Sequence, residues 1–487
     1  MRTVNEYLKQ VDEVIKAGPY TDDWDSLKQR KIPEWFSKGK FGLFIHWGAF
    51  TVPECESEWY PRQMYLKGTK SCKHEEEHYG KNADYRQIAE QFNPQKFDAD
   101  EWLSVFKKSG AKYIMPVGEH HDGIKLYQSD LNRWNTVDMT PKRDFMKELH
   151  TACNQSDMGF LISNHRAEHY WFMNGARKNY PQSEALKEEY RDLYGDCALP
   201  PSNEIIPDSG KLVPTEEWLK DWLASACEMV DKNKPRGMYF DWWIQQLPFK
   251  PYLKKFLAYY YNRAYEWGIE PVVFYKYNAI MQGCAVFDVE RGQVNGIARE
   301  PWQCDTAIAK NSWGYTKNND YKSAYDCITN LIDVVSKNGC LMLNVGPKAD
   351  GMICEEEKAV LLKMGKWLHR NGEAIYDTEP FTVFGEGKKQ SAGAFKENLK
   401  YTTHNYRFTF KTGVIYVFPL SAKARKNFYI RSLRKDNNKG ITYKIKNISV
   451  LGSSQKVEWK QDLFGFKISL ERKIISELPI CFKIEID

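Results

Sequence analysis

Between about residue 40 and residue 375, short runs of hydrophobic residues alternate with longer stretches in which hydrophobic and polar residues recur at helical spacing. The hydrophobic runs have the length of buried strands and span 41–46, 112–117, 159–163, 237–241, 271–275 and 340–345. Helical spacing is clearest in 321–332 and 360–368, where one face of each predicted helix is hydrophobic. This alternation predicts an α/β fold of repeated strand–helix units, and we expect a (β/α)8 TIM barrel.

Several of the predicted strands end in a polar or ionisable residue. His46, His120, Asp241 and Asn344 all occupy such positions. In a (β/α)8 barrel the carboxyl ends of the strands build the active site, so we expect these side chains to meet at one end of the barrel.

After about residue 380 the pattern changes to the strict alternation that is typical of antiparallel strands. The alternating segments are 406–410, 414–418, 456–460, 466–470 and 480–486. We therefore predict a barrel domain with an N-terminal helical extension over 1–378 and a C-terminal antiparallel β-sandwich over 379–487. A charged insertion over 174–212 matches no motif and fits either a lid or a contact between subunits.

Composition and charge narrow the classes of partner. The 70 basic and 64 acidic residues are mixed along the chain and give a formal charge of only +6, so no nucleic-acid partner is expected. The 11 cysteines include no Cys-x-x-Cys pair, which argues against a disulfide framework and a structural zinc site. Aromatic residues make up 14% of the chain, more than a core usually needs, and the surplus suits a site that stacks against rings.

The N-terminal segment has no apolar stretch of signal-peptide length, and no run of membrane-spanning length follows. We expect a cytoplasmic protein with no membrane partner, or a secreted or periplasmic one if a signal segment has been removed. The sequence does not indicate an oligomeric state.

Asp241 is the strongest candidate for a catalytic group. It ends a hydrophobic strand and precedes Trp242 and Trp243, so its carboxylate would lie at the barrel mouth among aromatic rings, where it could attack an anomeric carbon. The alternative is structural, because Asp is also a favoured N-cap for a helix that follows a strand.

Five segments, taken together and in this order, resemble the α-L-fucosidase family, glycoside hydrolase family 29. They are KFGLFIHWG at 40–48, EWY at 58–60, HHDG at 120–123, YFDWW at 239–243 and LNVGPKADG at 343–351, supported by the stretch 302–315. The likeness covers roughly residues 30 to 375. It implies a (β/α)8 barrel with a C-terminal β-sandwich, hydrolysis of terminal α-L-fucose from fucosylated glycans with retention, and neither a metal nor an organic cofactor. It also implies that Asp241 is the nucleophile.

A retaining mechanism needs a second carboxyl group about 5 Å from the first. Our candidate is Glu290, which lies one strand–loop step after the strand 271–275, where this family often carries its acid/base. Asp288, Arg291 and Glu300 lie nearby in the sequence, so a different placement of the acid or a surface salt bridge stays open.

The resemblance also implies a set of residues that contact the sugar ring: His46, Glu58, Trp59, His120 and His121. These side chains suit fucose, because hydrogen-bonding groups can bind its hydroxyls and an aromatic wall can cover its methyl group.

Three further residues are weaker candidates for the sugar site. Tyr239 lies two positions before Asp241, on the same face of the strand, and with Trp313 it could form the aromatic wall, although both could equally fill the barrel. Lys276 follows the fifth predicted strand and could replace an Arg that relatives use near the ring.

Two other functions compete with this interpretation. His165, Glu168 and His169 match the His-x-x-Glu-His pattern of inverted zincins, but the segment directly follows the predicted strand 159–163, so we expect it on a barrel loop. A catalytically silent carbohydrate-binding relative is the third class, and the presence of Asp241 and Glu290 argues against it. A chelator separates the classes, since only the zinc hydrolase would lose activity in it.

Overall fold

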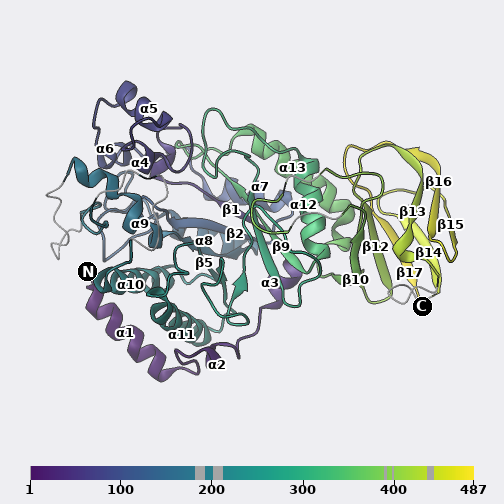
Figure 1. Cartoon of the computed structure of the whole chain (residues 1–487), viewed down its shortest axis with the longest axis horizontal. Helices are drawn as coiled ribbons and strands as arrows, with labels where there is room; N and C mark the ends of the chain where they lie inside the picture. The colour runs from purple at the N-terminus through teal and green to yellow at the C-terminus, as the bar shows by residue number, and fades with distance from the viewer. Residues whose placement is uncertain are drawn as a thin grey trace.

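The computed structural model describes residues 2–180, 192–200, 204, 212–388, 392–397, 400–435 and 444–487. Its first part is a barrel of parallel strands with helices outside (Figure 1). The strands are β1 (Phe41–Ile45), β2 (Tyr113–Glu119), β3 (Gly159–Phe160), β4 (Ile162–Asn164), β5 (Gly237–Phe240), β6 (Val272–Tyr275), β7 (Val286–Phe287), β8 (Trp302–Ala307) and β9 (Gly339–Val345). The predicted barrel is therefore confirmed.

The strands follow the order β7-β6-β5-β4-β2-β1-β9-β8, and β3 pairs with β2 just before β4 does. A parallel bridge between Asp288 and Gln303 links the two ends of this order and closes the barrel. The sequence did not predict β7 or β8. The strand β7 is only two residues long and its second residue, Phe287, is exposed, whereas β8 is buried but contains Gln303, Asp305 and Thr306 and so is not a hydrophobic run.

Helices cover most of the outside of the barrel. They are α1 (Val4–Ala17), α2 (Trp24–Leu27), α3 (Glu34–Gly39), α4 (Tyr60–Gln63), α5 (Lys70–His78), α6 (Tyr85–Ala89), α7 (Ala99–Ser109), α8 (Phe145–Ser156), α9 (Arg166–Phe172), α10 (Glu216–Asn233), α11 (Phe249–Trp267), α12 (Ala324–Ser336) and α13 (Glu355–Asn371). Short polar side chains start several of them, since Asp98, Asp144, Thr215 and Ser323 each accept a hydrogen bond from the first helical turn.

One side of the barrel departs from the regular strand–helix repeat. Residues 276–301, all of them described, contain no helix between β6, β7 and β8. This part of the wall is built from loop, and a segment from the C-terminal part of the chain packs against it: Gly393 pairs with Gln293 in an antiparallel bridge.

Hydrophobic side chains fill the inside of the barrel from its lower end, where the strands begin, toward its upper end, where the strands finish. Phe36 of α3 lies at the lower end and contacts the ring of Phe274 with centroids 5.1 Å apart. Above it Phe44, Tyr239 and their neighbours fill the centre. Because side chains alternate along a strand, Phe44 and His46 share one face, as do Tyr239 and Asp241. The polar member of each pair lies nearer the carboxyl end of its strand.

The C-terminal part forms two antiparallel sheets around a second hydrophobic core. The strands are β10 (Glu379–Glu386), β11 (Tyr406–Lys411), β12 (Val414–Pro419), β13 (Arg425–Ile430), β14 (Ile445–Val450), β15 (Val457–Gln461), β16 (Phe466–Ile474) and β17 (Phe482–Ile486). One sheet has the order β10-β11-β12-β17-β14 and the other β13-β16-β15. Helices α12 and α13 lie between the barrel and these sheets (Figure 1). The antiparallel sandwich is thus confirmed.

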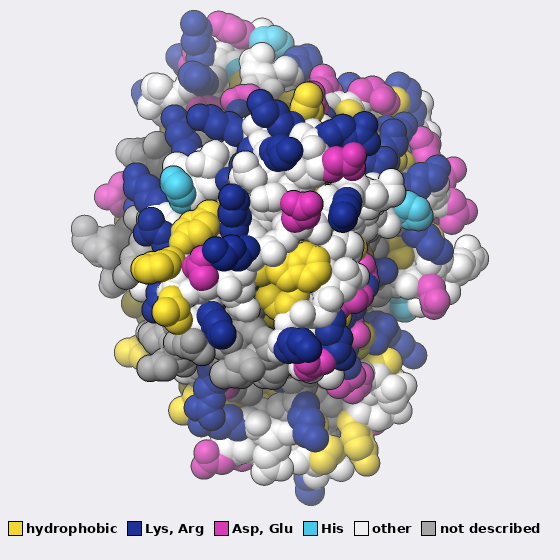
Figure 2. Space-filling model, turned by 90° about the vertical axis from the view of Figure 1, so that its right-hand side faces the viewer, with side chains coloured by type: hydrophobic (Ala, Val, Ile, Leu, Met, Phe, Trp, Pro, Cys, Tyr) yellow, Lys and Arg dark blue, Asp and Glu magenta, His cyan; other side chains and the backbone are white. Residues whose placement is uncertain are grey.

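The end of the molecule formed by these sheets carries mixed surface chemistry (Figure 2). Lys and Arg side chains are spread over this face, with Asp and Glu side chains and small hydrophobic patches between them.

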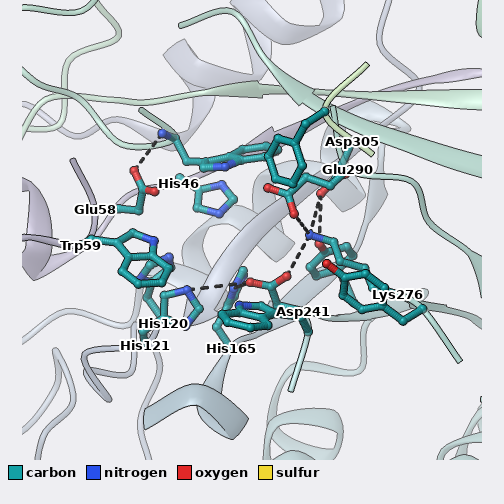
Figure 3. Close-up of a pocket in the computed structure, with 15 residues that line it drawn as sticks. His46, Glu58, Trp59, His120, His121, His165, Asp241, Lys276, Glu290 and Asp305 are labelled. Atoms are coloured by element: carbon teal, nitrogen blue, oxygen red, sulfur yellow. Dashed lines mark hydrogen bonds and ion pairs between the residues drawn. The ribbon is translucent and has the colours of Figure 1, made fainter. Parts of the chain in front are cut away.

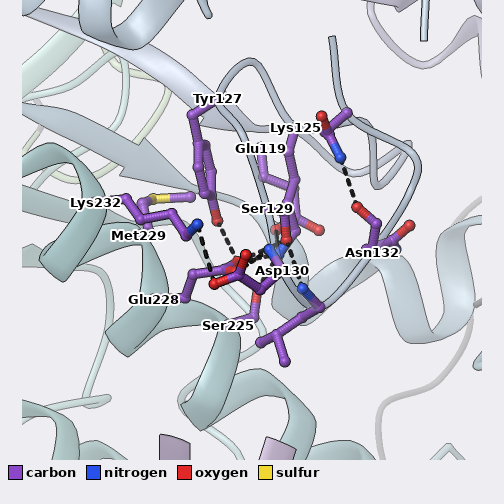
Figure 4. A network of polar contacts seen from close by, with 12 residues as sticks. Glu119, Lys125, Tyr127, Ser129, Asp130, Asn132, Ser225, Glu228, Met229 and Lys232 are labelled. Carbon is purple, nitrogen blue, oxygen red and sulfur yellow. Dashed lines mark hydrogen bonds and ion pairs between the residues drawn. The ribbon is translucent and has the colours of Figure 1, made fainter. Parts of the chain in front are cut away.

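A buried polar network fixes the segment that follows β2 (Figure 4). Glu228 of α10 accepts hydrogen bonds from Lys125 Nζ (3.2 Å), Tyr127 Oη (3.3 Å), Ser129 Oγ (2.7 Å) and the Asp130 backbone N–H (2.6 Å). The ammonium of Lys125 also donates to Ser225 Oγ at 2.6 Å. The chain that carries His120 and His121 is therefore tied to the outer helix α10.

The insertion 174–212 and the question of membrane-spanning segments can be compared with the structure only over the described residues. Most of the insertion 174–212 lies outside the described residues, apart from a 3-10 turn at Asn174–Lys178 and residues 179–180, 192–200, 204 and 212. Among the helices that are described, none has the length and apolarity that crossing a membrane requires.

Candidate active site

A cavity of about 220 Å³ opens at the carboxyl end of the barrel strands (Figure 3). All ten residues singled out from the sequence line it: His46, Glu58, Trp59, His120, His121, Tyr239, Asp241, Lys276, Glu290 and Trp313. Five more residues complete the lining: His165, Trp242, Tyr277, Asp305 and Phe395.

Asp241 directly follows β5, and its carboxylate lies between a cation and two imidazoles. Oδ1 accepts a hydrogen bond from Lys276 Nζ at 2.8 Å, and Oδ2 lies 3.3 Å from His165 Nδ1 and 3.8 Å from His121 Nε2. Burial acts to raise the pKa of Asp241, but Lys276 and the hydrogen bond from His165 outweigh it and hold the pKa well below its usual range. The carboxylate is thus kept ionised.

The structural alternative for Asp241 is wrong. The next helix, α11, begins at Phe249 with Pro248 as its N-cap, so Asp241 caps no helix. Its side chain faces the cavity together with the residues of the neighbouring strands (Figure 3).

Glu290 lies in the loop between β7 and β8, across the cavity from Asp241. Its Oε2 accepts a hydrogen bond from Lys276 Nζ at 2.6 Å. Burial raises the pKa of Glu290 to about 7 against the opposing effect of Lys276, and the nearby Asp305 and Asp241 add to the rise. Glu290 is therefore protonated up to neutral pH, whereas Asp241 is not.

The other acidic residues near Glu290 in the sequence have other surroundings. Asp288 is buried and accepts a hydrogen bond from Gln303 Nε2 at 2.8 Å, and neither it nor Glu300 lines the cavity. Arg291 packs its guanidinium 4.7 Å from the centre of the Trp313 ring. Of Asp288, Glu290 and Glu300, only Glu290 therefore lines the cavity together with Asp241.

One ammonium group joins the two carboxyl groups. Because Lys276 Nζ contacts Asp241 at 2.8 Å and Glu290 at 2.6 Å, the two contacted oxygens are no farther apart than these distances laid end to end. This upper limit is compatible with the short separation, roughly 5–5.5 Å, found in retaining glycosidases. Asp305 Oδ2 lies 3.7 Å from the same ammonium and accepts a hydrogen bond from Tyr239 Oη at 2.9 Å.

Three histidines of the cavity, His46, His120 and His121, are neutral. Burial holds the pKa of His46 and of His120 well below the usual range and lowers that of His121 to about 3. His46 Nδ1 lies 2.7 Å from Asn344 Oδ1, while Asn344 Nδ2 donates to the Trp313 carbonyl at 2.7 Å. Since Oδ1 can only accept, Nδ1 of His46 carries the proton and Nε2 is an acceptor.

Glu58 and the two tryptophans form another wall. Glu58 Oε2 accepts hydrogen bonds from Ser312 Oγ at 2.9 Å and from the Trp313 backbone N–H at 2.8 Å. The Trp313 ring lies 5.0 Å from that of His46, and the Trp59 ring lies 5.9 Å from that of His121. Carboxylate, imidazoles and indoles therefore surround the same space.

The backbone turns sharply just after the site residues. Trp243, Tyr277 and Arg291 adopt positive φ values of 78°, 54° and 42°, and they follow Asp241, Lys276 and Glu290 within one or two residues. Non-glycine residues pay about 1–3 kcal/mol each in this region, and such strain is concentrated at functional sites.

The zinc-hydrolase alternative does not match the geometry. His165 points to Asp241, but His169 lies away from it, with Nδ1 2.8 Å from the His121 carbonyl and Nε2 2.9 Å from the Leu193 carbonyl. The expectation of a loop was also wrong, since Glu168 and His169 lie in the helix α9, whose N-cap is His165. The predicted trio His165, Glu168 and His169 therefore does not converge on one point.

Other groups in the cavity do have ligand atoms within 4.8 Å of one another, namely His46, His120 and His165, and also His121, His165 and Asp241. A cation in the second group would be repelled by the Lys276 ammonium that already contacts Asp241. The first group is made of imidazoles, which bind sugar hydroxyls as well as metals.

Sequence reasoning missed five lining residues. His165 stands at the end of a strand, so the rule that identified His46 could have found it, but the zincin pattern gave it another role. Asp305 lies inside the stretch 302–315 already noted as supporting. Trp242 and Tyr277 directly follow Asp241 and Lys276, whereas Phe395 lies beyond the barrel and had no local signal.

Comparisons with known proteins agree on one family. The family model described as alpha-L-fucosidase matches residues 7–373. The plasma alpha-L-fucosidase of Homo sapiens is 30% identical over 379 residues, covering 74% of this chain and 73% of the relative. The tissue alpha-L-fucosidase of Mus musculus is 27% identical over 486 residues, covering 95% and 93%. A crystal structure of Thermotoga maritima alpha-fucosidase in complex with fucose has a TM-score of 0.76 at 26% identity, covering 96% of this chain and 100% of that one.

Proposed function

The chain belongs to the α-L-fucosidase family and is a glycoside hydrolase that acts on α-L-fucosides, and we propose that it works with retention, with Asp241 as nucleophile and Glu290 as acid and base. The observation that carries this assignment is the ammonium of Lys276, which contacts both carboxyl groups at 2.8 and 2.6 Å. This contact supports the short separation that double displacement needs. Lys276 lowers the pKa of both groups, but burial, Asp305 and Asp241 raise that of Glu290 to about 7, so the two groups differ in protonation state.

In the first step the Asp241 carboxylate attacks the anomeric carbon and forms an ester bond to the fucosyl group. The bond from that carbon to the leaving oxygen breaks, and the proton of Glu290 passes to this oxygen. The leaving group departs as a neutral alcohol, and Glu290 becomes a carboxylate.

In the second step Glu290 takes a proton from water, whose oxygen attacks the anomeric carbon and displaces Asp241. Esterified Asp241 has lost its negative charge, and that charge was one cause of the raised pKa of Glu290. The pKa of Glu290 therefore falls in the intermediate, which suits its change from acid to base.

Sugar recognition follows from the other walls of the cavity. The neutral imidazoles of His46, His120 and His121 offer both donors and acceptors to hydroxyl groups, and Glu58 offers a carboxylate. Trp59 and Trp313 supply apolar surface for the methyl group and the ring face. We further propose that the natural substrate is a fucosylated oligosaccharide or glycoconjugate.

The test is release of para-nitrophenol from para-nitrophenyl α-L-fucoside. We expect turnover by the wild type, none by Asp241→Ala, and partial rescue of Asp241→Ala by azide. Azide would attack from the side that Asp241 occupied and give a fucosyl azide of inverted configuration. Unimpaired hydrolysis by Asp241→Ala, or the absence of turnover on any fucoside, would contradict the proposal.

A further inference from the structure

A second cavity, of about 340 Å³, adjoins the first on the side of Glu290. Lys276, Tyr277 and Glu290 line both cavities. The second one continues along Phe287 and Val294 of the helix-free wall and reaches residues 392–394 of the C-terminal part. Glu290 thus stands between two connected spaces.

The segment 392–397 is fixed to the barrel by several contacts. Gly393 and Gln293 exchange backbone hydrogen bonds of 2.8 and 3.3 Å, and the Phe395 N–H donates to the Glu290 carbonyl at 2.9 Å. Glu397 accepts a hydrogen bond from Lys322 Nζ at 2.6 Å and one from Thr306 Oγ1. The main chain of Glu290 is therefore held by a part of the molecule outside the barrel.

The segment 392–397 packs tightly against Gly292, which lies two residues after Glu290 in the loop. A Cβ atom built on Gly292 would lie only 2.2 Å from the Gly393 carbonyl oxygen. Any side chain at this position would push the segment away, so the contact depends on glycine.

Two exposed aromatic residues flank the boundary between the cavities. Tyr277 is 52% exposed and Phe395 is 61% exposed, so neither ring is needed for the core. Both have left-handed backbone, with φ of 54° and 56°, a conformation in which glycine would avoid the strain. A large aromatic side chain at a strained and exposed position lowers stability without adding core contacts, which indicates that the rings serve binding.

We propose that Tyr277 and Phe395 form the binding site for the leaving group and hold a sugar ring between or beneath their rings. This inference rests on the proposed function, because Glu290 can protonate the leaving oxygen only if the rest of the leaving group lies on its side of the cavity. The C–H face of a pyranose is apolar and packs on aromatic rings, whereas its hydroxyls stay in solvent. The occupant is thus the sugar to which fucose is attached.

The proposal gives the C-terminal part a role in specificity as well as in support. Phe395 comes from the stretch between β10 and β11, yet it lines the catalytic cavity. It is a residue that contacts the leaving group, and the backbone hydrogen bond to Glu290 positions the acid.

The experiment compares two substrates that share fucose and differ in the leaving group: a fucosyl disaccharide and α-L-fucosyl fluoride, whose fluoride ion fills no sugar site. The variants are Tyr277→Gly and Phe395→Gly, because glycine accepts the positive φ at both positions. The readout is the kcat/KM for the disaccharide divided by that for the fluoride. We expect this ratio to fall about 3- to 10-fold in each variant, the effect of losing one aromatic contact.

The matched control is Phe464→Ala, which removes a 78% exposed aromatic side chain from the C-terminal sheets and should leave the ratio unchanged. If either glycine variant does not fold, Asn replaces glycine, because Asn tolerates the same backbone. An unchanged ratio in both variants, whatever the rate on the fluoride, overturns the proposal. A wild type that hydrolyses the fluoride but no disaccharide also overturns it, whereas a wild type inactive on both overturns the proposed function itself.

Discussion

Two buried clusters of a lysine with carboxylates have similar composition but different roles in this protein. In one, Lys276 contacts Asp241 and Glu290; in the other, Lys125 contacts Glu228. Both ammonium groups are almost fully buried, and each lies within 4 Å of more than one carboxylate, since Lys125 Nζ is also 3.8 Å from Glu119 Oε2. Glu228, however, is surrounded by four protein donors (Figure 4), while Asp241 and Glu290 border an open cavity (Figure 3).

This difference shows why a buried charge by itself does not identify an active site. A carboxylate whose acceptor positions are all filled by the protein has nothing left for a substrate, and it stabilises one conformation. A carboxylate that shares one cation and faces a cavity keeps free acceptor positions and a pKa that depends on its neighbour. The predictions below separate the two clusters by what is lost when each is changed.

The largest effect is expected for Glu290→Gln, which keeps the size of the side chain but removes its proton donor. We expect kcat/KM for a fucosyl disaccharide to fall roughly 10²- to 10⁴-fold. The loss on α-L-fucosyl fluoride should be far smaller, because fluoride leaves without a proton. Equal losses on the two substrates would show that Glu290 is not the acid.

Next in size is the effect of Lys125→Met on stability. Removing this cation leaves the buried carboxylate of Glu228 without its cationic partner. This loss should lower the free energy of unfolding by about 3–5 kcal/mol. Denaturant unfolding measures this loss, and the folded fraction should keep its kcat. A variant as stable as the wild type would contradict the structural role of the Lys125 cluster.

The matched change in the other cluster, Lys276→Met, should damage activity more than stability. We expect kcat/KM to fall roughly 10²-fold. Lys276 lowers the pKa of both carboxyl groups, so its removal should move both limbs of the pH profile to higher pH. A profile that only falls in height would mean that Lys276 binds substrate without controlling protonation.

The wild-type pH profile tests the same cluster without a mutation. Glu290 must be protonated and its pKa is raised to about 7, so kcat/KM should decline as pH rises through about 7. Asp241 must be ionised and its pKa is held well below the ordinary range, so the acid limb should lie below about pH 4. An acid limb near pH 6 would exclude this assignment of the two pKa values.

The smallest effect is expected from EDTA. The reaction assigned to Asp241 and Glu290 needs no metal, so kcat/KM in chelator should match that in buffer. If activity is lost and returns with zinc, the cluster of His46, His120 and His165 would be the place to look for the ion.

The sequence predicted the strands that are continuous hydrophobic runs, and the site residues that lie at the ends of these runs. The strands β1, β5 and β9 are continuous hydrophobic runs, and the polar residues at their ends lie where a barrel places its active site. The ten residues expected at the site line one cavity, but their individual roles stay predictions. So do the domain limits 1–378 and 379–487, the cytoplasmic location and the lack of a nucleic-acid partner.

What the sequence could not predict depends on contacts between distant segments. The strand β7 has two residues and carries no periodic pattern. The pKa of Glu290 depends on Lys276 and Asp241, which follow β6 and β5, and on Asp305, which lies within β8. Phe395 reaches the cavity only because a stretch of the barrel wall contains no helix, and nothing near Phe395 in the sequence indicates this.

The helix-free wall also limits how this enzyme can be shortened or recombined. A chain cut after residue 378 would keep every barrel strand and Asp241, but it would lose the backbone partner of Glu290 and the contacts of Glu397 with Thr306 and Lys322. Such a fragment would lose control of its proton donor before it lost its nucleophile. If Phe395 contacts the leaving group as proposed, exchanging C-terminal parts between relatives would change leaving-group preference, with Tyr277 and the fucose-binding residues kept.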